Sequence, residues 1–213
     1  MSDCCTPRGY RRIFSERSAH AAAARYRKKG LDSTSRRIVD LLLAQGVAGK
    51  TVLEVGGGVG AIQLELLRAG ASSAVSVELT PTYELAAAEL LAETGLADRV
   101  ERRVVDFVAT GSEVDQADIV VLNRVVCCYP DMPRLVGTAA EHARGTLVLS
   151  FPKRRWWTRA ALAMGNGGFR LTRREFHVFL HPPARIRDEA EAHGLKVKSD
   201  QPGLFWEVLT ASA

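Results

Sequence analysis

The stretch Thr51-Val-Leu-Glu54-Val-Gly56-Gly-Gly58-Val-Gly60-Ala61 decides the fold of this chain. Four of its first five residues suit a buried strand, a glycine-rich turn follows without a gap, and a helical pattern of apolar residues then begins. Glycine is needed in such a turn because the backbone must reach positive φ and because a Cβ would hold a ligand away. The stretch therefore predicts a strand, a tight turn and a helix whose first N–H groups face a ligand.

Glu54 indicates which ligand this turn binds, because the glycines alone also satisfy the dinucleotide pattern G-x-G-x-x-[G/A]. Two residues before Gly56, a carboxylate would repel a pyrophosphate but attract a ligand that carries an ammonium and a sulfonium. That ligand is S-adenosylmethionine (SAM). From Glu54 to Gly60 the stretch resembles motif I of class I SAM-dependent methyltransferases, [E/D]-x-G-x-G-x-G, and matches it completely. The resemblance implies SAM as the cofactor and S-adenosylhomocysteine as the product. The alternative is an ordinary turn with extra glycines.

Length and composition fit one globular domain, because 213 residues can bury a full-sized core. No apolar run reaches the roughly 18 to 20 residues that would span a bilayer. The N-terminal Met-Ser-Asp-Cys-Cys also lacks the apolar region of a signal peptide. We therefore expect a cytoplasmic protein without a transmembrane segment.

Positive charge gathers in two segments of the chain. Residues 1–37 hold ten lysines and arginines against three acidic residues, and residues 153–174 hold seven and no acidic residue, so each segment carries a net charge of +7. The whole chain carries only +5, so the remainder is acidic. Two basic segments indicate an anionic partner, which could be a carboxylate or phosphate substrate, a nucleic acid or a membrane surface. Alternatively, many of these cations simply lie on solvated faces.

Regular alternation of strand and helix patterns predicts an α/β fold: one doubly wound, Rossmann-like sheet of seven mostly parallel strands, with an antiparallel last strand. The expected strands are residues 51–55, 74–78, 100–105, 118–123, 146–151, 175–181 and 204–210. Expected helices are residues 14–29, 35–45, 81–94, 132–143, 156–164 and 183–193, while residues 1–12 look flexible and the glycines at 165–168 break the pattern. We divide the chain into a basic arm with a helical lid (1–34) and a SAM-binding domain (35–213) with a substrate-side insertion around 153–175.

Three strand ends supply further candidate cofactor contacts. Glu78 stands 18 residues after Gly60, where a carboxylate can accept hydrogen bonds from both ribose hydroxyls, with Leu79 beside it. In class I methyltransferases the position of Asp106 accepts from the adenine amino group while an adjacent apolar side chain, here Phe107, packs on the ring. Asn123 closes the fourth strand and completes the predicted cofactor site.

The methyl acceptor should lie beyond the fourth strand, because ligands of open α/β sheets bind outside the carboxyl ends of their strands. Tyr129-Pro130, the arginine-rich segment after the fifth strand and Phe179-Leu-His181 resemble magnesium-protoporphyrin O-methyltransferases, which esterify a porphyrin propionate. Those enzymes carry a histidine just before Tyr-Pro, where this chain has a cysteine, so the same substrate does not follow. The candidate substrate contacts are Tyr26, Arg124, Cys128, Trp156 and Trp157.

Methyl transfer is an in-line displacement from a donor that is already activated, so the protein must mainly position the acceptor and exclude water. A carboxylate acceptor needs cations but no base, whereas a phenol or alcohol needs a base, for which Tyr129 and His181 are candidates. The pairs Cys4-Cys5 and Cys127-Cys128 could hold a soft metal or metalloid if the arm brought them together. Adjacent cysteines in an extended segment point to opposite sides, however, so we predict packed thiols and no metal site.

The leading prediction is a SAM-dependent methyltransferase that acts on a small acidic or aromatic molecule, with O-methylation favoured. A nucleic-acid methyltransferase could use the basic arm on phosphates, but an Asn-Pro-Pro-Tyr-type motif and an RNA-binding module are missing. A SAM-binding regulatory protein without turnover is a second alternative. A dehydrogenase is disfavoured by Glu54 and by the antiparallel end of the sheet. The oligomeric state does not follow from the sequence.

Overall fold

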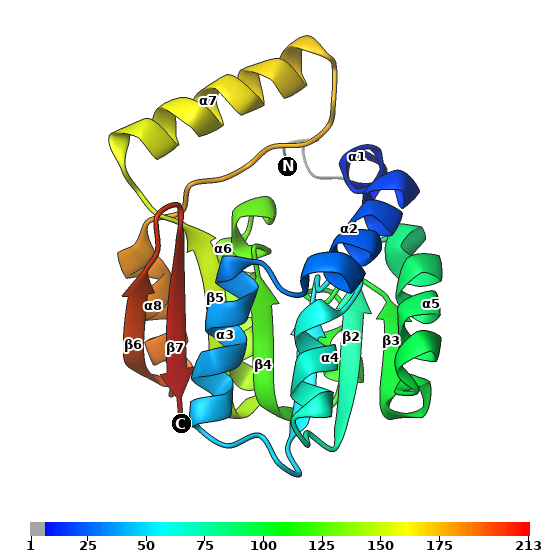
Figure 1. Cartoon of the computed structure of the whole chain (residues 1–213). Helices are drawn as coiled ribbons and strands as arrows, with labels where there is room; N and C mark the ends of the chain where they lie inside the picture. Colours follow the sequence, from blue (N-terminus) through cyan, green and yellow to red (C-terminus); the bar gives the residue numbers. More distant parts are fainter. Residues whose placement is uncertain (1–6) are drawn as a thin grey trace.

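Seven strands form one sheet in the computed structural model, which describes residues 7–213 (Figure 1). The strands are β1 (Thr51–Val55), β2 (Ser73–Glu78), β3 (Val100–Val104), β4 (Ala117–Asn123), β5 (Ala143–Pro152), β6 (Lys196–Pro202) and β7 (Trp206–Ser212). Their order is β3-β2-β1-β4-β5-β7-β6. β1 to β5 pair in parallel, whereas β7 lies antiparallel to both β5 and β6. The predicted doubly wound sheet with an antiparallel last strand is therefore confirmed.

Helices cover both faces of this sheet (Figure 1). They are α1 (Pro7–Ile13), α2 (Glu16–Lys29), α3 (Ser33–Ala44), α4 (Ala61–Arg68), α5 (Glu84–Thr94), α6 (Met132–Glu141), α7 (Trp156–Leu171) and α8 (Pro183–Ala192). Four short 3₁₀ turns are η1 (Pro81–Tyr83), η2 (Ala97–Arg99), η3 (Gly111–Glu113) and η4 (Val126–Cys128). Among these described helices, none combines the length and the apolar character needed to cross a bilayer.

The core has two layers because successive strand residues point to opposite faces. In β1, Val52 packs with α3 and α4, whereas Leu53 packs with α6 and α8 on the other face. β4 is buried on both faces in the same way, which explains its nearly continuous apolar sequence. A third cluster joins α2 to α4 and α5 through small residues, including Ala19 and Ala23. These contacts hold α2 and α5 beside α4, the helix that follows the glycine-rich turn.

The last third of the chain differs from the prediction in two places. α7 continues through the glycines at 165–168, because contacts with the returning chain outweigh their low helix propensity. The Asn166 amide accepts from the Val178 N–H at 2.9 Å and donates to the Val178 carbonyl at 2.9 Å. Residues 175–181 are therefore not a strand, since their backbone groups bond to Asn166 and to the Cys127 carbonyl. The remaining strand is β6, an edge strand whose lysines and proline conceal it in the sequence.

The N-terminal part also differs from the prediction for residues 1–12, which were expected to be flexible, because residues 7–13 form helix α1. Residues 1–6 of that prediction lie outside the described residues. α1, α2 and α7 all lie beyond the carboxyl ends of the parallel strands (Figure 1). α1 covers the edge where the glycine-rich turn and the strand ends meet, while α7 stands away from the sheet. The regions predicted as a lid and as a substrate-side insertion thus surround one end of the sheet.

Candidate functional site

A cavity of about 280 Å³ lies at the carboxyl ends of β1, β2 and β4, beneath α1; we call it the inner cavity. It brings together most of the predicted cofactor contacts. Those that line it are Gly56, Gly58, Glu78, Leu79, Asp106, Phe107 and Asn123. Three of the residues predicted on the acceptor side also line it, namely Arg124, Cys128 and Tyr129. Residues distant in sequence therefore converge on one cavity.

The glycine-rich turn leaves no space for side chains on its cavity side. Gly56 and Gly58 both have positive φ, 66° and 64°. A Cβ on Gly56 would lie 2.6 Å from Cγ2 of Val125, and one on Gly58 would lie 3.1 Å from Cε1 of Tyr83. Glycine is therefore required by conformation and by space at both positions. The backbone of the turn is left open to a ligand.

Glu54 lies beneath the turn rather than on the wall of the inner cavity. Its exposed fraction is 1%, and its carboxylate accepts from the backbone N–H of Gln63 in the first turn of α4, at 3.3 Å. A Cβ on Gly57 would overlap this carboxyl group, so the turn wraps closely around it. Burial raises the pKa of Glu54 to about 7, although the Gln63 N–H and the Arg102 cation both lower it. Glu54 thus holds the turn, as does Gly60, which begins α4 with a φ of 77°.

Glu78 lines the inner cavity at the end of β2. Its carboxylate accepts from the Gly58 N–H at 2.5 Å, so it joins the strand end to the turn. Burial raises the pKa of Glu78 to about 8, although the Gly58 N–H and Arg102 both favour the ionised form. A carboxylate at this position can exchange its backbone partner for ligand hydroxyls.

Arg102 is a supporting residue that the sequence analysis missed. From β3 its guanidinium donates to the Gly58 carbonyl at 3.0 Å and forms two bonds to the Glu84 carboxylate, at 2.8 and 3.0 Å. It therefore fixes the turn from behind and supplies positive charge near Glu54 and Glu78. The sequence gives no signal for this role, because an arginine in a strand with a polar pattern is common. The role follows only from the position of Arg102 beside the glycine-rich turn in the folded structure.

Asp106 and Phe107 occupy the far wall of the inner cavity. The Asp106 carboxylate accepts from the Val108 N–H at 3.0 Å and from the Tyr129 hydroxyl at 3.4 Å. Phe107 is buried and packs edge-on against His142, with ring centroids 5.1 Å apart. The pair therefore combines an acceptor oxygen with an apolar surface, and its contact with adenine stays a prediction.

A polar network fixes the end of β4. Asn123 donates to the Ser35 hydroxyl at 3.0 Å and accepts from the Ser150 hydroxyl at 2.7 Å. The next residue, Arg124, has a φ of 64°, which an arginine rarely adopts. Its backbone N–H donates to the Ser150 hydroxyl at 2.8 Å, which helps to hold this conformation. The side chain of Arg124 is thereby directed along the cavity wall.

Asp32 neutralises Arg124. The guanidinium lies 2.5 Å from the Asp32 carboxylate and 5.1 Å from the ring centroid of Trp206. Burial of Asp32 opposes ionisation, but Arg124 and hydrogen bonds from Ser35 and Thr34 outweigh it and lower the pKa of Asp32. An anionic ligand must therefore compete with Asp32 for this cation.

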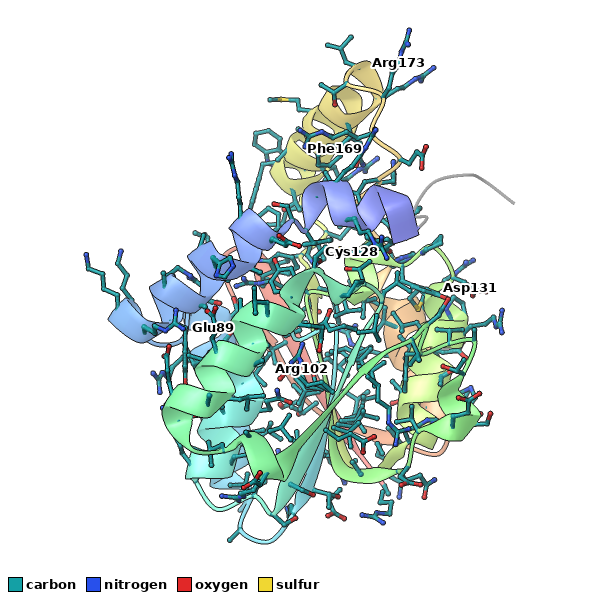
Figure 2. The ribbon with its side chains drawn as sticks, turned by 90° about the vertical axis from the view of Figure 1, so that its right-hand side faces the viewer. Glu89, Arg102, Cys128, Asp131, Phe169 and Arg173 are labelled. Atoms are coloured by element: carbon teal, nitrogen blue, oxygen red, sulfur yellow. The ribbon has the colours of Figure 1, made fainter. Side chains whose placement is uncertain are left out.

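A second, more apolar cavity of about 310 Å³ adjoins the first; we call it the outer cavity. The two cavities share the wall residues Phe14, Arg124 and Cys128. The other wall residues of the outer cavity are Cys127, Pro152, Leu162, Phe176, Val178, Phe205 and Trp206. Arg124 is the one charged residue among these described wall residues. In Figure 2 Cys128 lies between the sheet and Phe169 of α7, in the region that joins the two cavities.

The two candidate bases are both engaged within the protein. Burial and the neighbouring Asp106 raise the pKa of the Tyr129 hydroxyl to about 12, so it stays protonated near neutral pH. His181 lines neither cavity; its Nε2 lies 3.0 Å from the Tyr129 carbonyl oxygen and its ring stacks on Phe179. Burial lowers the pKa of His181. His181 therefore positions the segment that carries Tyr129.

Three predicted substrate contacts lie elsewhere. Tyr26 is buried against α4, where its hydroxyl donates to Glu65 at 2.5 Å and accepts from Arg68 at 2.8 Å. Trp156 points into solvent, with an exposed fraction of 81%. Trp157 packs on Phe205 instead of pairing with Trp156, with ring centroids 5.8 Å apart. Neither tryptophan lines the inner or the outer cavity.

Two aromatic side chains, one in α1 and one directly after it, take the place that was predicted for these residues. Tyr10 and Phe14 line the inner cavity, and the Tyr10 hydroxyl donates to the Cys128 carbonyl. Both rings pack edge-on against Phe176, which also contacts Phe169 of α7. The spacing of Tyr10 and Phe14, four residues apart, was the available signal for a helix with one aromatic face.

The vicinal cysteines of η4 lie closer together than an extended segment would allow. The Sγ atoms of Cys127 and Cys128 are 3.7 Å apart because the 3₁₀ turn brings both side chains to one side. The hydrogen bond to Cys127 and burial both raise the pKa of the Cys128 thiol. Cys4 and Cys5 lie outside the described residues. Within residues 7–213, His, Cys, Asp and Glu side chains form no group that could hold a metal ion.

Comparison with known proteins identifies similar families and folds. A family model described as a methyltransferase domain matches residues 23–200. Ribosomal protein L11 methyltransferase from Histophilus somni is 30% identical over 95 residues, which cover 44% of this chain and 31% of that protein. The chain thus spans less than a third of the length of the curated relatives it matches.

Two solved structures illustrate the similarity in fold. Magnesium protoporphyrin IX methyltransferase from Synechocystis PCC 6803 with bound SAH has a TM-score of 0.69 at 20% identity, covering 84% of this chain and 81% of that chain. An O-methyltransferase family 2 protein from Planctomyces limnophilus in complex with apigenin also has a TM-score of 0.69 at 20% identity, covering 94% of this chain and 62% of that chain. At these identities the likeness concerns the fold.

Proposed function

Since this chain belongs to the methyltransferase-domain family, we propose that it is a SAM-dependent methyltransferase and that it methylates an ionised oxygen of a small molecule with a flat, apolar body. The observation that carries this proposal is the pair of joined cavities. One has the polar groups that SAM requires, and the other has aromatic and aliphatic walls. The walls that they share mark the place where donor and acceptor would meet.

The residues of the inner cavity fit SAM. The Glu78 carboxylate would accept from the ribose hydroxyls, and Asp106 would accept from the adenine amino group while Phe107 packs on the ring. The side-chain-free surface of Gly56 and Gly58 would let the amino-acid end of the ligand approach the backbone. Bound SAM supplies a methyl group already activated by a sulfonium. The chain itself must orient the acceptor and exclude water.

The outer cavity supports an acceptor with an aromatic or otherwise flat, apolar body. Phe14, Phe176 and Trp206 offer aromatic surface, and burying apolar area there is the main source of affinity. An acidic group on the acceptor would bind Arg124 only in exchange for Asp32. We propose that this exchange selects acceptors that carry a carboxylate.

The state of the two candidate bases favours an acceptor that ionises without help. The Tyr129 hydroxyl stays protonated and donates a hydrogen bond to Asp106, and His181 is hydrogen-bonded to the Tyr129 carbonyl. Neither arrangement suits removal of a proton from an alcohol at neutral pH. A carboxylate or an acidic phenol needs no base, so O-methylation of such a group matches the residues present.

The first test is calorimetric titration of the purified chain with S-adenosylhomocysteine and, separately, with NAD. We expect binding of S-adenosylhomocysteine alone.

A second assay then measures methyl transfer to an aromatic carboxylic acid, its methyl ester and an aliphatic acid of similar size. Turnover of the aromatic acid alone would support the proposal. Binding of NAD, or methylation of RNA in preference to all three acids, would contradict it, and cofactor binding without turnover of any acceptor would favour a regulatory role.

A further inference from the structure

α7 presents an apolar face to solvent. All sixteen residues of α7 are described, and Thr158 is the one buried among them. Trp156, Met164 and Leu171 are 81, 78 and 86% exposed. The helical period places these three on the same side as Ala160, Ala163 and Gly167, which are exposed as well. The solvent side of α7 is therefore a continuous apolar stripe; we call it the outer stripe.

The opposite side of α7 holds the helix in position. Leu162 lines the outer cavity, Phe169 packs edge-on against Phe176, and Asn166 forms two hydrogen bonds with the Val178 backbone. The outer stripe is therefore displayed by a fixed helix rather than by a frayed segment. Figures 1 and 2 show α7 standing beyond the strand ends, and Figure 2 shows Arg173 just past its C-terminal end.

Positive charge surrounds the outer stripe. Residues 153–174 contain seven lysines and arginines and no acidic residue. Six of the seven are exposed, namely Arg154, Arg155, Arg159, Arg170, Arg173 and Arg174. An exposed apolar stripe flanked by cations is the pattern of a helix that lies in the interface of an anionic bilayer. A tryptophan at one end of the stripe suits the same interface.

We propose that α7 docks this protein on an anionic lipid membrane. The apolar side chains of the outer stripe enter the boundary between headgroups and acyl chains, and the arginines bind the headgroup phosphates and carboxylates. A second copy of the chain is a poorer occupant, because pairing two outer stripes would bring together two segments 153–174, each with seven cations and no acidic residue. Since Leu162 also lines the outer cavity, docking would place that cavity beside the bilayer, and only this last step rests on the proposed function.

The test is flotation of the full chain with vesicles of phosphatidylcholine alone and of phosphatidylcholine mixed with phosphatidylserine. We expect flotation with the anionic vesicles only. Replacing Trp156, Met164 and Leu171 together by serine should abolish it. Arg159→Gln with Arg170→Gln should weaken binding by about fivefold for each arginine removed. Tryptophan fluorescence should shift to shorter wavelength on binding, and this shift should be smaller in Trp156→Phe.

Matched variants control for apolar surface and charge elsewhere. Leu85→Ser removes an exposed leucine from α5, and Lys196→Gln with Lys198→Gln removes two exposed cations from β6. These variants should float like the parent. Equal flotation of the serine variant and the parent would overturn the proposal. So would a parent that binds no vesicles but self-associates or retains RNA, if the serine variant loses that self-association or retention. S-adenosylhomocysteine binding, measured separately, reports folding and would test the proposed function even if flotation failed.

Discussion

Two buried carboxyl groups behind the glycine-rich turn make the stability of the cofactor-free protein depend on pH. Burial raises the pKa of Glu54 to about 7 and that of Glu78 to about 8, from ordinary values of 4.5. Their stabilising contribution is therefore complete below about pH 4.5 and is lost as pH rises through 7 and 8. At about 1.4 kcal/mol for each pKa unit, the loss is about 3 kcal/mol for Glu54 and about 5 kcal/mol for Glu78.

Urea unfolding between pH 5 and pH 9 measures this dependence at the scale of single residues. The free energy of unfolding should fall with rising pH in the parent. It should fall less in Glu78→Gln, which keeps an acceptor for the Gly58 N–H but cannot ionise. Asp98→Asn, at an exposed position in η2, serves as the control and should follow the parent. Equal slopes for all three proteins would show that Glu78 is already ionised near pH 5.

Gly58→Val should abolish cofactor binding while the fold persists. A branched side chain at φ 64° is strained, and it would enter the space between the turn and Tyr83. Gly95→Val is the matched control, because Gly95 has a similar φ of 66° but nothing within 4 Å of its Cβ position. We expect the affinity for S-adenosylhomocysteine to fall more than about a hundredfold in Gly58→Val, as when several buried polar contacts are lost. Similar affinities of the two variants would contradict this account.

At the scale of elements, α1 depends on a close backbone approach to the segment before α8. A Cβ on Gly9 would overlap the Glu175 carbonyl oxygen, so Gly9→Ala should push α1 off the inner cavity. Hydrogen exchange in residues 9–13 should then quicken, and S-adenosylhomocysteine should dissociate faster. Gly167→Ala is the control, since nothing lies within 4 Å of its Cβ position, and it should instead stabilise α7 by about 0.5 to 1 kcal/mol. Unchanged exchange in Gly9→Ala would mean that α1 does not rest on this contact.

The sequence could predict an element only where its backbone hydrogen bonds go to the partners that its local pattern implies. β1, β4 and β5 are buried on both faces, so their apolar runs indicated strands directly. Residues 175–181 have an equally strand-like composition but bond to Asn166 and Cys127, and these partners lie far away in sequence. β6 is the converse case, because an edge strand needs few apolar residues. The glycines of α7 predicted a helix end that the structure does not have, because tertiary contacts rather than local propensity determine where this helix ends.

At the scale of the whole molecule, the inner and outer cavities differ in how far the sequence predicts them. The inner cavity depends on one local motif and on strand ends that a parallel sheet places together, so Gly58, Glu78 and Asp106 could be chosen in advance. The outer cavity combines side chains from the turn after α1, η4, the end of β5, α7, the segment after α7 and the start of β7. No local pattern joins these segments, which is why Phe14, Phe176 and Trp206 were missed while Trp156 was chosen.

The pair of Asp32 and Arg124 joins the N-terminal helices to the acceptor side, because Asp32 begins α3 and Arg124 follows β4. Asp32→Asn keeps a good helix cap but removes the charge that competes for Arg124. If an acidic acceptor must displace Asp32, this variant should lower the KM for a carboxylate acceptor by about tenfold, the gain expected when one buried charge competitor is removed. The KM for a neutral aromatic acceptor should not change. Glu93→Gln, which removes the exposed partner of Arg27, should leave both values unchanged. An equal effect of Asp32→Asn on acidic and neutral acceptors would show that Arg124 supports the cavity wall rather than selecting the substrate.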